Sequence, residues 1–199
     1  MGNKIEEAIS ANIAVHSAMA DDYNKIEPHF RPESIKRVED IIADLVSKAP
    51  IDKALDLGCG TGFMINILKK HVSEIVGVDV TQDMMDKVDK SGSTDIHLIN
   101  SDTGTVQLKS KYFDIATAYT FLDHLYDMQP TVQNAYNSLK PGGRFYADLS
   151  PNFYFWEAIK KLDKNMNYDP IIQREVNAVW KKDEEIELIS TTIKAKNTY

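Results

Sequence analysis

The sequence predicts an α/β protein built on a doubly wound, mostly parallel β-sheet. Short apolar segments typical of buried strands alternate with segments whose apolar residues recur at helical spacing. Such alternation predicts parallel strands, because each helix carries the chain back to the same end of the sheet. Ligands of such sheets lie outside the strand carboxyl ends. The expected strands are residues 54–57, 75–79, 96–100, 112–118 and 144–150.

Helices are expected before the first strand and between most of the later strands, whereas residues 101–105, after the third strand, are expected to form a polar loop. The apolar residues of these helices recur every three or four positions, with polar residues on the opposite face. Pro50 ends the helix that precedes the first strand, and Thr81 is the expected N-cap of the helix that follows the second. The expected helices cover residues 3–20, 34–48, 63–71, 82–90 and 130–139.

The most distinctive stretch follows the first strand and contains Gly58, Gly60 and Gly62 at alternate positions. Glycine permits positive φ and leaves no Cβ between the backbone and a ligand. The free N–H groups of the following helix face the same space. This turn is therefore predicted to bind a ligand.

The spacing of the glycines narrows the choice of ligand. A dinucleotide fingerprint, G-x-G-x-x-G, requires glycine where the chain has Phe63, so NAD-dependent oxidoreduction is disfavoured. The pattern Asp56-x-Gly58-x-Gly60-x-Gly62 instead resembles motif I of the class I S-adenosylmethionine (SAM)-dependent methyltransferases. The resemblance covers about residues 53–150 and implies the Rossmann-like methyltransferase fold, with SAM as cofactor and S-adenosylhomocysteine (SAH) as product.

Two further acids follow expected strands. Asp79 ends the second strand, where a carboxylate can accept hydrogen bonds from the two ribose hydroxyls that SAM and NAD share. The resemblance places Asp102 at the exocyclic amine of adenine. Taken singly, each acid is equally typical of a solvated strand end or a helix cap. The cofactor-binding residues that the resemblance implies are Asp56, Gly58, Cys59, Gly60, Gly62, Asp79, Val80, Ser101, Asp102, Thr103, Tyr119 and Tyr23.

Residues 119–125 resemble motif IV of the family, beside the transferable methyl group. His124 and Tyr119 are the candidate catalytic residues there, although a histidine that caps or packs the loop explains His124 as well. Methyl transfer depends mainly on placing the nucleophile, with a base where the nucleophile is protonated. The histidines share no metal-ligand spacing, so no metal site is expected.

The chain is expected to form one domain with three parts. Residues 1–33 resemble the N-terminal arm that closes over the cofactor in small-molecule methyltransferases, with a merely packing surface helix as the alternative. Residues 34–150 are the expected SAM-binding core. Residues 151–199 contain an aromatic cluster at 153–156, interpreted as packing rather than pocket lining, and two alternating segments that predict a β-hairpin.

The role of this C-terminal hairpin, residues 173–195, has two interpretations. It is either the sixth and seventh strands of the family's sheet or a substrate-side insertion, with Trp180 or its neighbours lining the pocket. The charged turn and the absence of a long apolar final strand favour the insertion. An insertion would leave an open sheet edge and predicts self-association as a homodimer.

Composition limits the partners and the compartment. The net charge of −7, without a basic cluster, argues against a nucleic-acid partner. Cys59 is the single cysteine and is expected to fill a place that needs a small residue rather than to act as a nucleophile. No signal segment or apolar run of about 18 residues is present, which predicts a cytoplasmic protein without a membrane partner.

These observations predict a SAM-dependent methyltransferase acting on a small molecule. The alternative is a SAM-binding protein that lacks transferase activity and regulates or stabilises a partner. The sequence leaves O-, N- and C-methylation open.

Overall fold

The computed structural model describes residues 2–148, 153–163, 165–170, 172–174, 176–177 and 180, with the backbone alone for 2–3 and 153–156. The chain divides into two compact units, Met1–Ser150 and Pro151–Tyr199. Each unit has hydrophobic clusters of its own. None of the helices in the described part of the chain is long and apolar enough to span a membrane.

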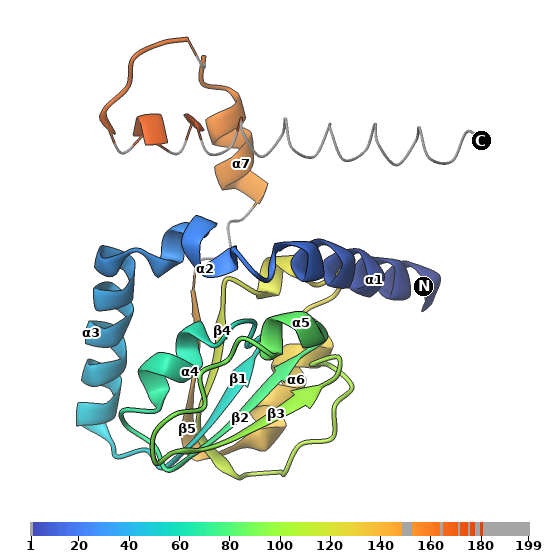
Figure 1. Ribbon diagram of the computed structural model, residues 1–199, viewed down its shortest axis with the longest axis vertical. Coiled ribbons are helices and arrows are strands. Elements are labelled where there is room, and N and C mark those ends of the chain that lie inside the picture. Colours follow the sequence, from blue (N-terminus) through green and yellow to red (C-terminus); the bar gives the residue numbers. More distant parts are fainter. Residues whose placement is uncertain are drawn as a thin grey trace. The chain divides into compact units, whose positions relative to one another are not determined.

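The first unit is built on a five-stranded sheet in which every neighbouring pair is parallel (Figure 1). The chain runs outward from β1 through β2 to β3 and then returns to β4 on the other side of β1, so the order is β3-β2-β1-β4-β5. This arrangement confirms the predicted α/β class and puts a switch in strand order between β1 and β4. The strands are β1 (Lys53–Leu57), β2 (Glu74–Asp79), β3 (Asp95–Asn100), β4 (Phe113–Tyr119) and β5 (Leu139–Asp148).

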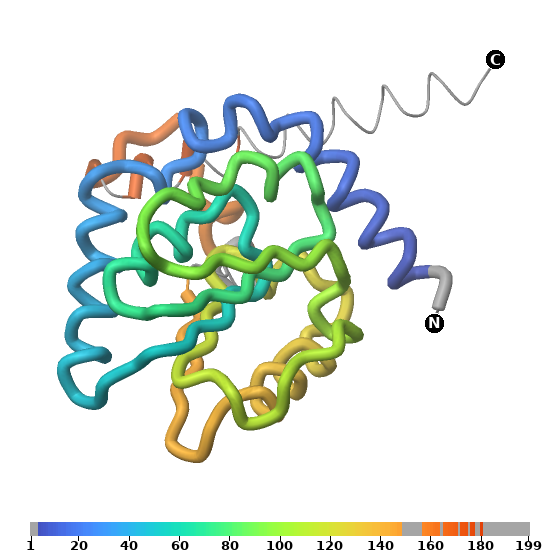
Figure 2. The backbone as a smooth tube through the Cα atoms, turned by 60° about the horizontal axis from the view of Figure 1, so that its bottom comes forward, coloured from blue at the N-terminus to red at the C-terminus, as the bar shows by residue number. Residues whose placement is uncertain are grey.

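Helices cover both faces of this sheet, and Figures 1 and 2 show α3 and α6 on opposite sides of it. The α5 helix is shorter than expected, since it ends at Met85. The helices of the first unit are α1 (Gly2–Met19), α2 (Tyr23–Ile26), α3 (Pro32–Lys48), α4 (Phe63–Leu68), α5 (Gln82–Met85) and α6 (Gln129–Ser138), with short 3-10 helices η1 (Pro28–Phe30) and η2 (Leu122–His124).

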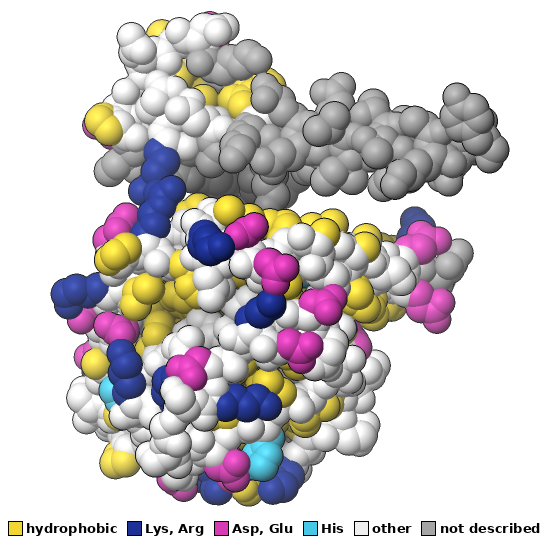
Figure 3. All heavy atoms as spheres, in the orientation of Figure 1, with side chains coloured by type: hydrophobic (Ala, Val, Ile, Leu, Met, Phe, Trp, Pro, Cys, Tyr) yellow, Lys and Arg dark blue, Asp and Glu magenta, His cyan; other side chains and the backbone are white. Residues whose placement is uncertain are grey.

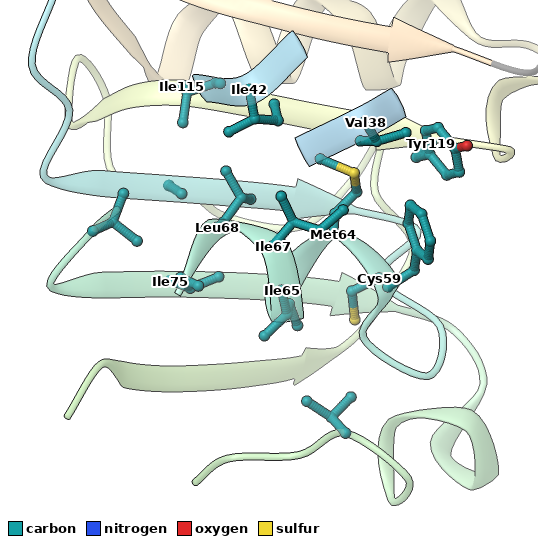
Figure 4. Close-up of a cluster of buried hydrophobic side chains, with 14 of the residues drawn as sticks. Val38, Ile42, Cys59, Met64, Ile65, Ile67, Leu68, Ile75, Ile115 and Tyr119 are labelled. Carbon is teal, nitrogen blue, oxygen red and sulfur yellow. The ribbon is translucent and has the colours of Figure 1, made fainter. Parts of the chain in front are cut away.

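The alternation of side chains along the strands explains two separate cores. On one face, Val38 and Ile42 of α3 meet the buried side chains of α4 over the sheet (Figure 4). On the other face, Leu55 and Leu57 of β1 lie in a cluster that includes Ala135 of α6. Because successive residues of a strand point to opposite faces, β1 is buried on both sides. This burial fixes the position of its carboxyl end.

The β5 strand begins earlier than the sequence predicted. Leu139 already pairs with Phe113 of β4, but the next paired residues are Ile115 and Arg144. The Pro-Gly-Gly segment between Leu139 and Arg144 is therefore a bulge inside the strand rather than a turn before it, as its two glycines allow.

The second unit corrects part of the hairpin prediction. Val176, Asn177 and Trp180 of its first arm are helical. Val176 and Trp180 are four residues apart and belong to one hydrophobic cluster with Ile159 of α7 (Phe153–Lys160), so helical spacing prevails over alternation. The second arm, any pairing of residues 181–199 with β5, and the side chains of the 153–156 cluster lie outside the described residues.

The two-sided core predicts a large loss of stability when the packing of α3 against the sheet is weakened. Ile42 has no exposed surface, so Ile42→Ala should lower the free energy of unfolding by about 2–5 kcal/mol, through lost transfer energy and the cavity left behind. Urea unfolding followed by circular dichroism measures this. Ile26→Ala, at a side chain that is 55% exposed, is the matched control and should change stability by less than about 0.5 kcal/mol. Equal effects of the two substitutions would contradict the packing described.

Candidate functional site

The glycine-rich turn joins β1 to α4 at the carboxyl edge of the sheet. Gly58, Gly60 and Gly62 all adopt positive φ, at 71°, 49° and 90°. The N–H groups of Gly58 and Cys59 both donate to the carbonyl oxygen of Val78, at 2.8 and 3.1 Å. The turn is thus folded back onto the end of β2, in a conformation that residues with a Cβ rarely adopt.

Two of these glycines are needed for different reasons. A Cβ at Gly58 would lie 2.2 Å from the ring of Phe121, so that ring packs directly on the glycine backbone. At Gly60 the nearest described atom to an added Cβ is Met84 Cε, at 3.6 Å. The Gly60 backbone is therefore open apart from this one contact at van der Waals distance, and Gly60 lies on the wall of a cavity.

Asp79 connects the turn to the next helix. Its Oδ2 accepts a hydrogen bond from Gly60 N–H at 2.9 Å, and its Oδ1 accepts one from Thr81 N–H at 2.8 Å. Each carboxylate oxygen has a second lone pair that remains available to a ligand. Asp79 thus organises the turn and still lines the cavity.

Asp56 is the most deeply buried acid of the site, with 2% of its surface exposed. Its Oδ1 accepts a hydrogen bond of 2.6 Å from the Thr117 hydroxyl. Burial raises the pKa of Asp56 to about 7, with a smaller contribution from Asp79 in the same direction, while the Thr117 bond opposes the rise. A cationic group arriving in the cavity would favour the ionised carboxylate.

The loop after β3 forms another part of the wall. Asp102 Oδ1 accepts from Gly104 N–H at 3.0 Å, which closes the loop on itself. Thr103 is buried, and its hydroxyl lies 2.8 Å from that of Thr131 on α6. Asn134 donates its side-chain amide to the Thr103 carbonyl, so α6 holds this loop in place.

The structure brings most of the sequence-predicted residues into this one cavity. The predicted residues that line it are Tyr23, Asp56, Gly58, Cys59, Gly60, Asp79, Val80, Asp102, Thr103, Tyr119 and His124. Gly62 and Ser101 are not on its wall as described. Burial raises the pKa of the Cys59 thiol, which keeps it protonated and agrees with a space-filling role.

Comparison with known proteins identifies this part of the chain. Residues 55–147 match the family model described as a methyltransferase domain. The segment is a class I SAM-dependent methyltransferase domain. It contains the glycine turn, Asp79 and Asp102, and it excludes the N-terminal helices.

Curated relatives are similar to the methyltransferase domain over a limited stretch. A ubiquinone biosynthesis O-methyltransferase of Coxiella burnetii is 31% identical over 103 residues, which cover 50% of this chain and 44% of that protein. A malonyl-[acyl-carrier protein] O-methyltransferase of Enterobacter lignolyticus is 24% identical over 128 residues, covering 63% and 51%. The chain spans about half the length of these relatives.

Solved structures share the fold. A SAM-dependent methyltransferase from Clostridium acetobutylicum superimposes with a TM-score of 0.60 at 23% identity, over 78% of this chain and 65% of that one. A DhpI–SAH complex gives 0.58 at 17% identity, over 69% and 67%. At these identities the likeness supports the architecture of the methyltransferase domain and not its substrate.

The N-terminal segment supplies a wall that sequence reasoning did not assign residue by residue. Ile5, Ile9, Asn12 and His16 of α1 line the cavity. Their spacing of four, three and four positions puts them on one helical face, and this periodicity was the available signal. The polar residues on that face, Asn12 and His16, could be assigned to the cavity only once the position of the cavity was known.

Polar contacts hold this segment against the methyltransferase domain. Thr61 of the glycine turn donates to Asn24 Oδ1 at 2.5 Å, and Lys87 forms an ion pair with Asp21 at 2.5 Å. The segment is therefore attached both at the glycine turn and just after α5.

An aromatic cluster fills the space between the arm and α4. Tyr119 stacks on Phe63 with ring centroids 4.6 Å apart, and His29 packs edge-on against Phe63 at 5.2 Å. Burial lowers the pKa of His29 to about 4. Glu27, whose Oε2 lies 3.9 Å from His29 Nδ1, is too far away for a hydrogen bond that would offset this effect.

The charges around the cavity are of one sign. Acidic residues on its wall include Asp56, Asp79, Asp102 and Asp127, whereas its described lining contains no Lys or Arg. The described residues also contain no group of three or more His, Cys, Asp or Glu that could hold a metal ion. The cavity therefore favours a cationic or neutral ligand over an anionic one.

The buried His29 predicts a pH dependence of stability. In the unfolded chain a histidine binds its proton near pH 6.5, but folded His29 does so only near pH 4. Stability should therefore fall as the pH drops from about 6.5 to 4, by up to about 3 kcal/mol from this group. The measurement is urea unfolding of the wild type and His29→Gln across this range. The variant should show a shallower loss, and parallel curves would show that His29 titrates normally.

Proposed function

We propose that this chain binds SAM in the cavity and transfers its methyl group to a small, uncharged acceptor. The observation that carries the proposal is the buried carboxyl of Asp56 on the wall of a cavity where the open backbone of Gly60 also lies. A buried acid on a wall whose described residues include no Lys or Arg suits a ligand that brings its own positive charge.

The residues present fit the cofactor. The ammonium group of SAM would pair with Asp56, and its amino-acid part would lie against Gly60, where a Cβ would otherwise intrude. Asp79 would accept hydrogen bonds from the ribose hydroxyls through its remaining lone pairs, and Asp102 would receive the adenine amine. When bound, SAM supplies a methyl group on a positively charged sulfur that is a good leaving group. Tyr23 of the arm and Val80 would add contacts.

The acceptor is proposed as uncharged because the described lining contains no Lys or Arg. Two curated relatives are O-methyltransferases by name, one in ubiquinone biosynthesis and one acting on malonyl-[acyl-carrier protein]. A carboxylate acceptor of the second kind would meet acids on the wall rather than cations. The cavity therefore supports O-methylation of a hydroxyl group on an apolar body.

Charge also supports a small-molecule acceptor rather than a nucleic acid. The chain carries a net charge of −7. On the face shown in Figure 3, the Lys and Arg side chains of the described residues are interspersed with Asp and Glu. A phosphate backbone is bound by clustered cations, which this face does not present.

The cofactor assignment predicts that Gly60 is needed for binding and not merely for folding. Gly60→Val should weaken SAM binding at least about tenfold, because the branched side chain would occupy part of the cavity that the cofactor needs. Gly142→Val is the matched control, since Gly142 also has positive φ and open space around it but lies in the β5 bulge.

Both variants should lose about 1–2 kcal/mol of stability from backbone strain. Isothermal titration calorimetry and urea unfolding together separate the two effects. If Gly60→Val is folded and binds SAM as tightly as Gly142→Val, the turn is structural and the proposed site is wrong.

A further inference from the structure

Two histidines from distant segments meet on the cavity wall. His16 belongs to α1 and His124 to η2, and their ring centroids lie 5.2 Å apart in an edge-to-face arrangement. Both line the cavity that contains the glycine turn. His16 lies outside residues 55–147, which match the family model. It is therefore a feature of this chain rather than of the matched domain.

Asn12 contacts both of the segments that contain these histidines. Its backbone carbonyl oxygen lies 2.8 Å from His16 Nδ1. Its side-chain amide donates a hydrogen bond of 2.8 Å to the backbone carbonyl of His124. One residue of α1 thus sets the ring orientation of His16 and ties η2 to the same helix.

The contact with Asn12 decides the tautomer of His16. A carbonyl oxygen only accepts hydrogen bonds, so Nδ1 of His16 must carry a proton. In the neutral ring, Nε2 then has the free lone pair and is the basic atom. The ring is prepared to take a proton at Nε2 while Nδ1 remains bonded to the backbone.

We propose that His16 is the general base that accepts the proton of the methyl acceptor, with Asn12 as the residue that positions it; this rests on the proposed function. As the acceptor oxygen forms its bond to the methyl carbon, the methyl–sulfur bond breaks and its electron pair stays on sulfur. Nε2 of His16 takes the hydroxyl proton and afterwards releases it to solvent. His124 packs on the edge of the His16 ring.

The structure favours His16 over Tyr119, one of the two catalytic candidates that the sequence suggested. Tyr119 stacks on Phe63, and burial raises the pKa of its hydroxyl even though the guanidinium of Arg37 opposes the rise. A phenol that ionises less readily is a poorer base near neutral pH than an imidazole with a free Nε2.

The first test is independent of turnover. Long-range 1H–15N spectra of 15N-histidine-labelled protein at pH 8, with His16→Gln used to assign the signals, report which ring nitrogen carries the proton. Neutral His16 should be protonated at Nδ1. Protonation at Nε2 would overturn the proposal, whether or not an acceptor is in hand.

The second test uses 4-methylcatechol, an uncharged aromatic diol, as the acceptor probe and SAH release as the readout. His16→Ala should lower kcat about 100-fold or more, while KM for the probe and Kd for SAM change less than about threefold. Added imidazole should raise the kcat of His16→Ala at least about tenfold. His97→Ala, a histidine exposed on β3, is the control and should retain wild-type kcat.

Asn12→Ala tests the tie between η2 and α1, because it removes the side-chain amide bonded to His124 and keeps the backbone carbonyl that His16 contacts. It should lower kcat about tenfold without rescue by imidazole, because the base itself is still present. Unchanged kcat in His16→Ala, or a loss that imidazole does not restore, would overturn the proposal. Wild-type protein that fails to bind SAM in calorimetry would instead refute the proposed function. If SAM binds and the probe is not methylated, the tautomer measurement tests the proposal: protonation of neutral His16 at Nδ1 supports it, and protonation at Nε2 overturns it.

Discussion

The site depends on one carboxylate that bridges two backbone segments. Asp79 accepts one hydrogen bond from the glycine turn and another from the start of the loop to α5. It can do so because β1 and β2 are adjacent parallel strands whose carboxyl ends reach the same edge of the sheet. Burial of β1 on both faces fixes that edge, and the positive φ values of the glycines let the turn reach back to Asp79. Without this bridge, the open backbone at Gly60 would have no fixed position.

The part of the site that sequence predicts well is the part set by local chemistry. The glycines at positions 58, 60 and 62 predict a turn directly from the sequence, because only glycine adopts positive φ without strain. Asp79 and Asp102 follow apolar runs, so their place at the ends of parallel strands follows from topology alone. The inner strands β1, β2 and β4 were predictable because a buried parallel strand has a largely apolar sequence.

The remaining parts of the site and the fold depend on contacts between residues far apart in the sequence, which local sequence patterns do not indicate. Asn12 and His16 become part of the cavity because α1 docks on the loop that contains His124. In the second unit, the segment around Val176 satisfies both alternation and helical spacing, and packing against Ile159 decides between them. Ser101, a loop position that the resemblance implies, is not on the described wall of the cavity.

Two parts of the chain form the wall of the cavity. The methyltransferase domain contributes the glycine turn and the acids, which suit the cofactor. The N-terminal arm contributes an apolar face with two polar positions, which suits the acceptor side. If the proposed function holds, the acceptor side of the site comes from a segment outside residues 55–147, which match the family model.

The central claim is that the carboxyl edge of this sheet holds SAM through its acids and glycine turn. Calorimetric titration of SAM, SAH and NAD into the wild type and into Asp79→Ala tests it most directly, with Asp83→Ala as a control at an exposed acid of α5. SAM and SAH should bind and NAD should not. Asp79→Ala should weaken SAM binding at least about tenfold, because charge-assisted hydrogen bonds contribute about 1.5–3 kcal/mol each. Unchanged SAM affinity in folded Asp79→Ala, or tighter binding of NAD than of SAM, would contradict the account.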